Sequence, residues 1–104
     1  MIIKFFDPSV ENFIGSLEKS TLAKVIRTLN LLERFGNKLG MPHSKKIGRE
    51  LFELRIRGHH EVRILYTFRG DTAILLHGFI KKSDRIPAKE LRIACQRLSS
   101  LDTR

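Results

Sequence analysis

The chain has 104 residues, which leaves room for one domain around one modest core and excludes multi-domain and large-barrel architectures. Lys and Arg number 20 against 11 Asp and Glu, a formal net charge of +9, while 41% of the residues are hydrophobic. The apolar fraction supports a folded globule, and the charge indicates a polyanionic partner. We therefore expect residues 1–104 to form a single domain that binds a polyanion.

The positive charge is concentrated in the second part of the chain. Residues 1–44 hold six basic and four acidic side chains, whereas residues 45–104 hold fourteen basic and seven acidic. The single cysteine, Cys95, permits no intrachain disulfide and suits a reducing compartment. The apolar runs are only a few residues long and match neither a signal peptide nor a membrane span, so we expect a cytoplasmic protein without a membrane partner.

The first predicted elements are a strand and two helices. Residues 2–6 form a β-type run that stops at Asp7, which can cap a helix, and Pro8, which fits the first helical turn. Apolar residues then repeat at helical spacing over residues 10–17 and, after a break, over residues 22–35. These spacings predict an antiparallel pair of amphipathic helices whose apolar faces cover a sheet.

Three strands are predicted after a long connection. Gly36 is expected to end the second helix, and residues 37–48 are rich in Gly, Pro, Ser, Lys and His without an apolar period, which predicts a loop. Residues 51–57, 62–68 and 72–80 then read as strands separated by short turns, an antiparallel meander. The third of them is almost continuously apolar, as expected for a central strand that is buried on both faces.

The last predicted element is a helix that begins at Pro87. Its apolar residues between Leu91 and Leu98 lie on one side, and we expect the chain to fray beyond Ser99. The predicted fold class is therefore α+β. An N-terminal strand and a helical hairpin pack on an antiparallel β-meander, a C-terminal helix follows, and the elements form two layers.

Strand alternation assigns the basic residues of the meander to one face. Because Leu54 belongs to the core, its neighbours Glu53 and Arg55 must face the other way, as must Arg57. The same alternation in the next strand sends Arg63 to that face. The three arginines are therefore expected to lie together.

Arg63 is the member of this set that most needs a partner, because a mid-strand guanidinium between apolar neighbours is costly to bury alone. The carboxylates expected on its face are Glu53 and Glu61. A phosphate is a further credible partner, since the planar guanidinium binds two oxygens at once.

Two lysine pairs can rim this face. Lys45 and Lys46 precede the meander, and Lys81 and Lys82 follow its last strand. Such a cluster of cations is typical of proteins that bind a nucleic-acid backbone, with strong salt dependence. A solvated basic surface or an acidic protein partner is the alternative that the charge pattern leaves open.

The sequence contains no nucleophile motif, phosphate-binding glycine loop or metal-ligand spacing, so we expect neither a cofactor nor a metal, including at His59 and His60. Metal-independent cleavage of RNA remains possible, because the ribose 2′-hydroxyl is itself the nucleophile. His59 and His60 are acid–base candidates, since histidine titrates near neutral pH. His77 is interpreted as a core histidine on the same side as Leu75, and His43 as a loop residue that contacts RNA or nothing.

Five spaced motifs coincide in residues 51–97: Glu53-Leu54-Arg55, Arg63-Ile64-Leu65-Tyr66, Leu76-His77-Gly78-Phe79, Lys81-Lys82 and Pro87. In this order they resemble the meander and last helix of the phage-derived, HigB-like branch of the RelE/ParE toxin superfamily. The resemblance implies a RelE-like fold and a ribosome-dependent mRNA interferase, an endoribonuclease that inhibits translation. It also implies a cognate antitoxin, of the helix-turn-helix type in this branch, and a toxin–antitoxin hetero-oligomer.

The resemblance also implies site residues. Arg63 matches the arginine that contacts the scissile phosphate in RelE-like toxins, and Lys82 falls where these toxins carry a second basic residue. Their two lysines on the strand before that arginine are replaced by Leu51 and Glu53, with Arg55 the nearest basic substitute. Their C-terminal tyrosine is absent too, because the single tyrosine, Tyr66, has core parity.

The catalytic candidates are therefore Arg63, Lys82, Arg55 and His60, and the candidates for RNA binding are Lys45, Lys46, Arg57, His59, Lys81 and Arg85. Two alternatives stay open. A ParE-like toxin would poison DNA gyrase without cleaving RNA, and a non-catalytic member would only bind RNA or its antitoxin.

Overall fold

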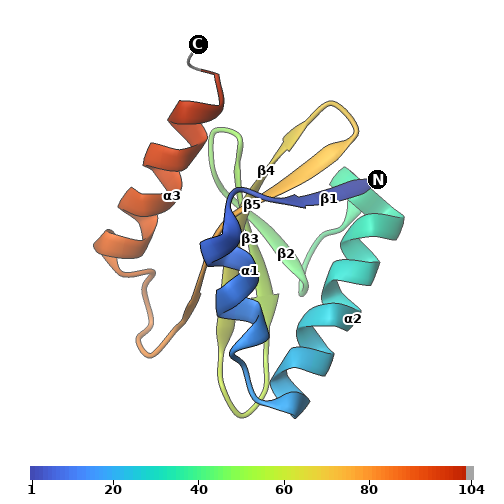
Figure 1. Cartoon of the computed structure of the whole chain (residues 1–104), viewed down its shortest axis with the longest axis vertical. Coiled ribbons are helices and arrows are strands. Elements are labelled where there is room, and N and C mark those ends of the chain that lie inside the picture. Colours follow the sequence, from blue (N-terminus) through green and yellow to red (C-terminus); the bar gives the residue numbers. More distant parts are fainter. Residues whose placement is uncertain (103–104) are drawn as a thin grey trace.

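A computed structural model describes residues 1–102. The elements in chain order are β1 (Ile2–Phe5), α1 (Pro8–Gly15), α2 (Lys19–Phe35), the short 3-10 helix η1 (Gly36–Lys38), β2 (Ser44–Gly48), β3 (Leu51–Ile56), β4 (Val62–Arg69), β5 (Thr72–Ile80) and α3 (Ala88–Leu101). They form one five-stranded sheet with the order β1-β5-β4-β3-β2, in which β1 is parallel to β5 and the other pairs are antiparallel (Figure 1). The predicted α+β class and the meander are confirmed.

The helix boundaries follow from the residues at them. The Asp7 carboxylate accepts a hydrogen bond from the backbone N–H of Ser9 at 2.9 Å, as a helix N-cap does. Hydrogen bonds from Ser9, first its hydroxyl and then its N–H, hold the pKa of Asp7 below its ordinary value. Gly36 ends α2 with a φ of 57°, a conformation that glycine adopts without strain. Both boundaries were predicted from the sequence.

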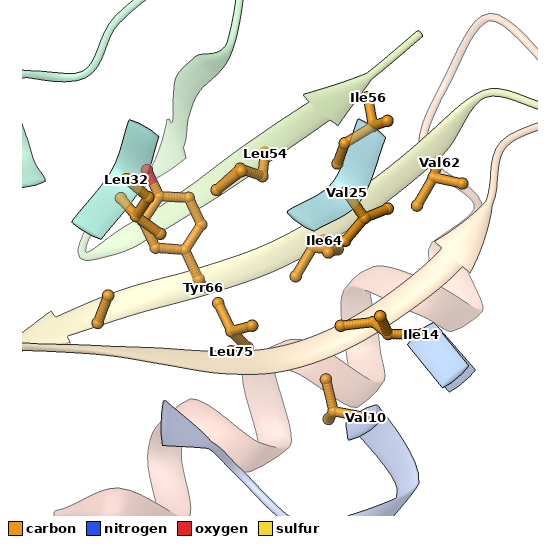
Figure 2. Close-up of a cluster of buried hydrophobic side chains, with 11 residues drawn as sticks. Val10, Ile14, Val25, Leu32, Leu54, Ile56, Val62, Ile64, Tyr66 and Leu75 are labelled. Carbon is orange, nitrogen blue, oxygen red and sulfur yellow. The ribbon is translucent and has the colours of Figure 1, made fainter. Parts of the chain in front are cut away.

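The sheet is covered on both faces, so the predicted two layers are in fact three. Helices α1 and α2 cover one face, where Val10 and Val25 pack on strand residues that include Leu54, Ile64 and Tyr66 (Figure 2). Helix α3 covers part of the other face, and Figure 1 shows it on the side away from α2. Strand β5 lies between β1 and β4 and is buried on both faces, as its apolar sequence predicts.

The predicted loop over residues 37–48 is wrong in its second half, because Ser44–Gly48 forms the edge strand β2. Ser44 is buried and its hydroxyl hydrogen-bonds to the phenol of Tyr66, while Ile47 packs against the cluster under α3. The remaining residues of β2 are polar or glycine, so neither alternation nor apolar content marks the strand. Lysines on an edge strand also discourage pairing with another chain.

An irregularity in the β4–β5 ladder changes which face His77 occupies. Leu65 pairs with His77 but Tyr66 pairs with Leu75, so Leu76 is an extra residue, a β-bulge. His77 therefore does not share a face with Leu75, contrary to the prediction. It lies under α3, where its Nε2 is 2.9 Å from Oε1 of Glu90.

The C-terminal helix is longer than predicted. It continues past Ser99 to Leu101, because Asp102 binds the guanidinium of Arg69 through two hydrogen bonds of 2.7 and 3.1 Å. Hydrogen bonding to Arg69 lowers the pKa of Asp102 below its ordinary value. The predicted fraying at residues 103–104 lies outside the described residues. Over residues 1–102, no helix combines the length and the apolar character that a membrane crossing needs.

Candidate nucleic-acid interface

Strand alternation does bring Arg55 and Arg63 together, and Glu53 lies between them. The Glu53 carboxylate is 3.6 Å from Nε of Arg55 and 3.5 Å from Nε of Arg63. Arg63 is also paired at its other end, where Nη1 lies 3.0 Å from Oε2 of Glu61. The four side chains therefore form one chain of alternating charge across β3 and β4, which we call the arginine–glutamate chain.

Arg63 is the inner member of the arginine–glutamate chain, because its side chain is only 3% exposed. Nη1 also donates to the carbonyl oxygen of Val62 at 3.1 Å. The two carboxylates expected from the sequence, Glu53 and Glu61, thus occupy the positions at which a phosphate was considered. Arg55 is the outer member, with 15% of its side chain exposed.

A pocket of about 250 Å³ opens between α2 and the end of β3, next to Arg55. The backbone N–H of Arg55 donates to the carbonyl of His43 at 2.8 Å, which extends the β2–β3 ladder and brings the segment before β2 to this pocket. The basic residues that line it come from three segments and are Lys24, Arg27, His43, Arg55 and Arg57. We call this site the basic pocket.

The basic pocket is lined by one lysine and three arginines and, among the residues that the structure describes, by no carboxylate. Its remaining lining consists of a threonine and apolar residues, among them Leu31 and Ile56. Cations on partly apolar walls interact more strongly with an anion than they do in bulk water. The basic pocket can therefore hold a phosphate group.

Two of its cations, Lys24 and Arg27, are not among the residues singled out from the sequence. Both lie on α2, which was interpreted only through its apolar face. Their spacing of three residues places them on the same side of a helix, and this was the available signal. Sequence alone did not show that α2 packs beside β3, which is what joins them to Arg55 and Arg57.

The turn between β3 and β4 carries the two predicted histidines. The rings of His59 and His60 pack edge to face, with 4.7 Å between their centroids. His60 also lies against the connection between α1 and α2, with its Nε2 3.8 Å from Oε1 of Glu18. The structure therefore places both histidines at the end of the sheet that carries Arg57.

The segment after β5 reaches the same end of the sheet. The backbone N–H of Lys81 donates to the carbonyl of Glu61 at 2.7 Å, so Lys82 leaves the sheet where β4 begins. Lys82 and Arg85 are both exposed. Figure 1 shows this segment and the β3–β4 turn at one end of the molecule.

The lysines of β2 do not act as a pair, because they point to opposite faces of the strand. Lys45 is in register with Glu53 and belongs to the face of the arginine–glutamate chain. Lys46 belongs to the other face, with its Nζ 5.9 Å from the centre of the Phe52 ring. Of the two, only Lys45 lies on the face to which the sequence assigned both.

Comparisons with known proteins agree with this fold. A family model described as "Phage derived protein Gp49-like (DUF891)" matches residues 12–99. No curated protein matches the chain. Among solved structures, a chain of the heterotetrameric YoeB–YefM toxin–antitoxin complex from Staphylococcus aureus matches with a TM-score of 0.55 and 20% identity, over 72% of this chain and 90% of that chain. The α+β fold of this chain is therefore similar to that of the matched chain of this complex.

Proposed function

The chain belongs to the phage-derived Gp49-like family, and we propose that it is the toxin of a type II toxin–antitoxin pair, a ribosome-dependent endoribonuclease that cleaves mRNA in the cytoplasm. The observation that carries this proposal is the basic pocket, which gathers Lys24, Arg27, Arg55 and Arg57. A nucleic-acid backbone supplies the regularly spaced anions that such a site binds.

The choice of RNA over DNA follows from the chemistry that these residues can perform. A base removes the proton of the 2′-hydroxyl, whose oxygen attacks the adjacent phosphorus. The bond from phosphorus to the 5′-oxygen breaks, and an acid protonates the departing oxygen. The products are a 2′,3′-cyclic phosphate and a 5′-hydroxyl, and the reaction needs cations and proton carriers only.

In this proposal Arg55 and Arg57 stabilise the charge that develops on the phosphorane, because both line the basic pocket. Arg63 holds Arg55 in place through Glu53, and contacts a phosphate itself only when Glu61 moves away. Lys82 supplies a further cation from the exposed segment after β5.

His60 is our candidate for proton transfer, since an imidazole can take up or release a proton near neutral pH. The flanking side chains bind RNA backbone away from the cleavage site; they are Lys45, Lys46, His59, Lys81 and Arg85. Ribosomal RNA then positions the message, which a chain of this size cannot enclose alone.

The proposed protein partner is a cognate antitoxin of the helix-turn-helix type. The solved relative comes from a heterotetrameric toxin–antitoxin complex, which supports a hetero-oligomer for this chain as well. An antitoxin segment with acidic and apolar residues would neutralise the basic pocket.

Controlled expression in bacteria tests the proposal. We expect induction of the wild type to stop incorporation of labelled amino acids within minutes and to leave plasmid supercoiling unchanged. The Arg57→Ala substitution should relieve this arrest of translation. Supercoiling defects or a DNA-damage response that precede translation arrest would instead indicate a gyrase poison. Intact translation in cells that accumulate folded protein would contradict both toxin mechanisms and leave a binding protein.

A further inference from the structure

Two turns from distant parts of the sequence meet at the end of the sheet that carries Arg57. One is the connection between α1 and α2, which ends in Glu18, and the other is the β3–β4 turn with His59 and His60 (Figure 1). One ligand atom from each of these three side chains, a carboxylate oxygen and two ring nitrogens, lies within 4.8 Å of the others. From the sequence we expected no metal at His59 and His60, because the carboxylate of Glu18 is some forty residues away along the chain.

The donor set determines which ion would bind. Two imidazoles and one carboxylate are ligands that zinc and its neighbours among the transition metals prefer, whereas magnesium and calcium prefer oxygen alone. In a tetrahedral zinc site with bonds of about 2.0–2.1 Å, the ligand atoms stand roughly 3.4 Å apart. The three side chains are at the surface, so small rotations about their side-chain bonds can close the remaining distance.

We propose that Glu18, His59 and His60 bind one divalent transition-metal ion of the zinc class, with water completing the coordination. The ion would fasten the helical hairpin to the β3–β4 turn, close to the basic pocket. The RNA chemistry proposed above uses no metal, and an ion on His60 would occupy the ring nitrogen of a candidate for proton transfer.

The neighbouring charges affect the affinity of this site for a metal ion. Lys24 approaches the turn closely, because a Cβ on Gly58 would lie 2.7 Å from its Nζ. This ammonium group opposes a second cation, while the carboxylate of Glu18 favours it. We therefore expect the site to bind transition metals with a high affinity for imidazole, such as zinc, and not to bind magnesium.

Calorimetric titration of the full chain, free of any histidine tag, with zinc chloride and with magnesium chloride tests the proposal. We expect one zinc ion per chain and no saturable binding of magnesium. Glu18→Gln and His60→Ala should each weaken zinc binding about tenfold or more, while His43→Ala, which changes a histidine outside the cluster, should not. Zinc should also raise the Tm of the wild type by several degrees, and should raise that of His60→Ala by less at the same zinc concentration.

Circular dichroism confirms that each variant is folded before it is titrated. The absence of saturable zinc binding to the wild type would overturn the proposal, as would wild-type affinity in both Glu18→Gln and His60→Ala. Because the readout is binding and Tm, the result does not depend on whether the chain cleaves RNA.

Discussion

Nη1 of Arg63 lies 3.0 Å from Oε2 of Glu61, and the same guanidinium faces Glu53 from a side chain that is almost fully buried. An arginine in this position is held by protein carboxylates in the absence of RNA. Its charge therefore supports the structure of the sheet at the same time as it serves the proposed site.

The Arg63→Ala substitution should destabilise the fold, because it leaves the buried carboxylate of Glu53 without one of its two partners. We expect a loss of about 3–5 kcal/mol in the free energy of unfolding, measured with urea. Arg92→Ala, at an exposed arginine of α3, is the matched control and should change stability by less than about 0.5 kcal/mol. A stability for Arg63→Ala close to that of Arg92→Ala would show that the ion pairs do not support the fold.

The basic pocket should carry a measurable part of RNA affinity. Replacing Arg27 or Arg57 with alanine should weaken binding of a single-stranded RNA and lower the slope of log affinity against log salt by about 1 for each phosphate that the variant no longer binds. Fluorescence anisotropy at several salt concentrations measures both quantities. Arg34→Ala, at an exposed position further along α2, should leave the slope unchanged. Equal effects at Arg27 and Arg34 would argue for a diffuse basic surface.

The arginine–glutamate chain and the basic pocket differ in how far the sequence predicts them. Alternation along β3 and β4 correctly placed Arg55 and Arg63 on one face, and the local signals at Asp7 and Gly36 correctly bounded the helices. The basic pocket could not be predicted, because it depends on the packing of α2 beside β3. A pairing between distant elements leaves no local pattern in the residues that take part.

Two of the errors in the predicted fold have similar causes. Strand β2 is stabilised by its pairing with β3 and by the contact between Ser44 and Tyr66, neither of which depends on an apolar pattern. The bulge at Leu76 shifts alternation by one residue, so the side of His77 could not be deduced by counting from Leu75. In each case a tertiary interaction overrides the sequence pattern.

Stability should fall in alkaline solution because of Tyr66. Burial raises the pKa of its phenol above the ordinary 10.0. The unfolded chain therefore loses this proton at a lower pH than the folded chain, the folded state binds more protons there, and the free energy of unfolding decreases as the pH rises above about 10. Since the chain has one tyrosine and no tryptophan, ultraviolet absorbance follows this phenol alone.

The Tyr66→Phe variant is the control for this titration. It should lose about 1 kcal/mol of stability with the Ser44 hydrogen bond and should lack the alkaline decrease that the phenol causes. Ionisation of Tyr66 at its ordinary pKa while circular dichroism stays native would contradict its burial.

Gly78 should not tolerate a side chain. A Cβ at this position would lie 2.6 Å from Cδ2 of Phe13, whose ring packs on the backbone of β5. Gly78→Ala should therefore cost about 1–3 kcal/mol in the free energy of unfolding. Gly15→Ala is the matched control, because no atom lies within 4 Å of its Cβ. Equal stabilities of the two variants would mean that α1 does not pack on β5 in this way.

Sequencing of RNA 5′ ends shortly after induction examines cleavage itself. For the wild type we predict new 5′-hydroxyl ends inside translated reading frames, at preferred codon positions, and their disappearance when translation is blocked beforehand. The Arg55→Ala variant should give far fewer of these ends at equal protein level, because Arg55 joins the basic pocket to the arginine–glutamate chain. Growth arrest with intact transcripts would contradict the assignment of this chain as an mRNA endoribonuclease.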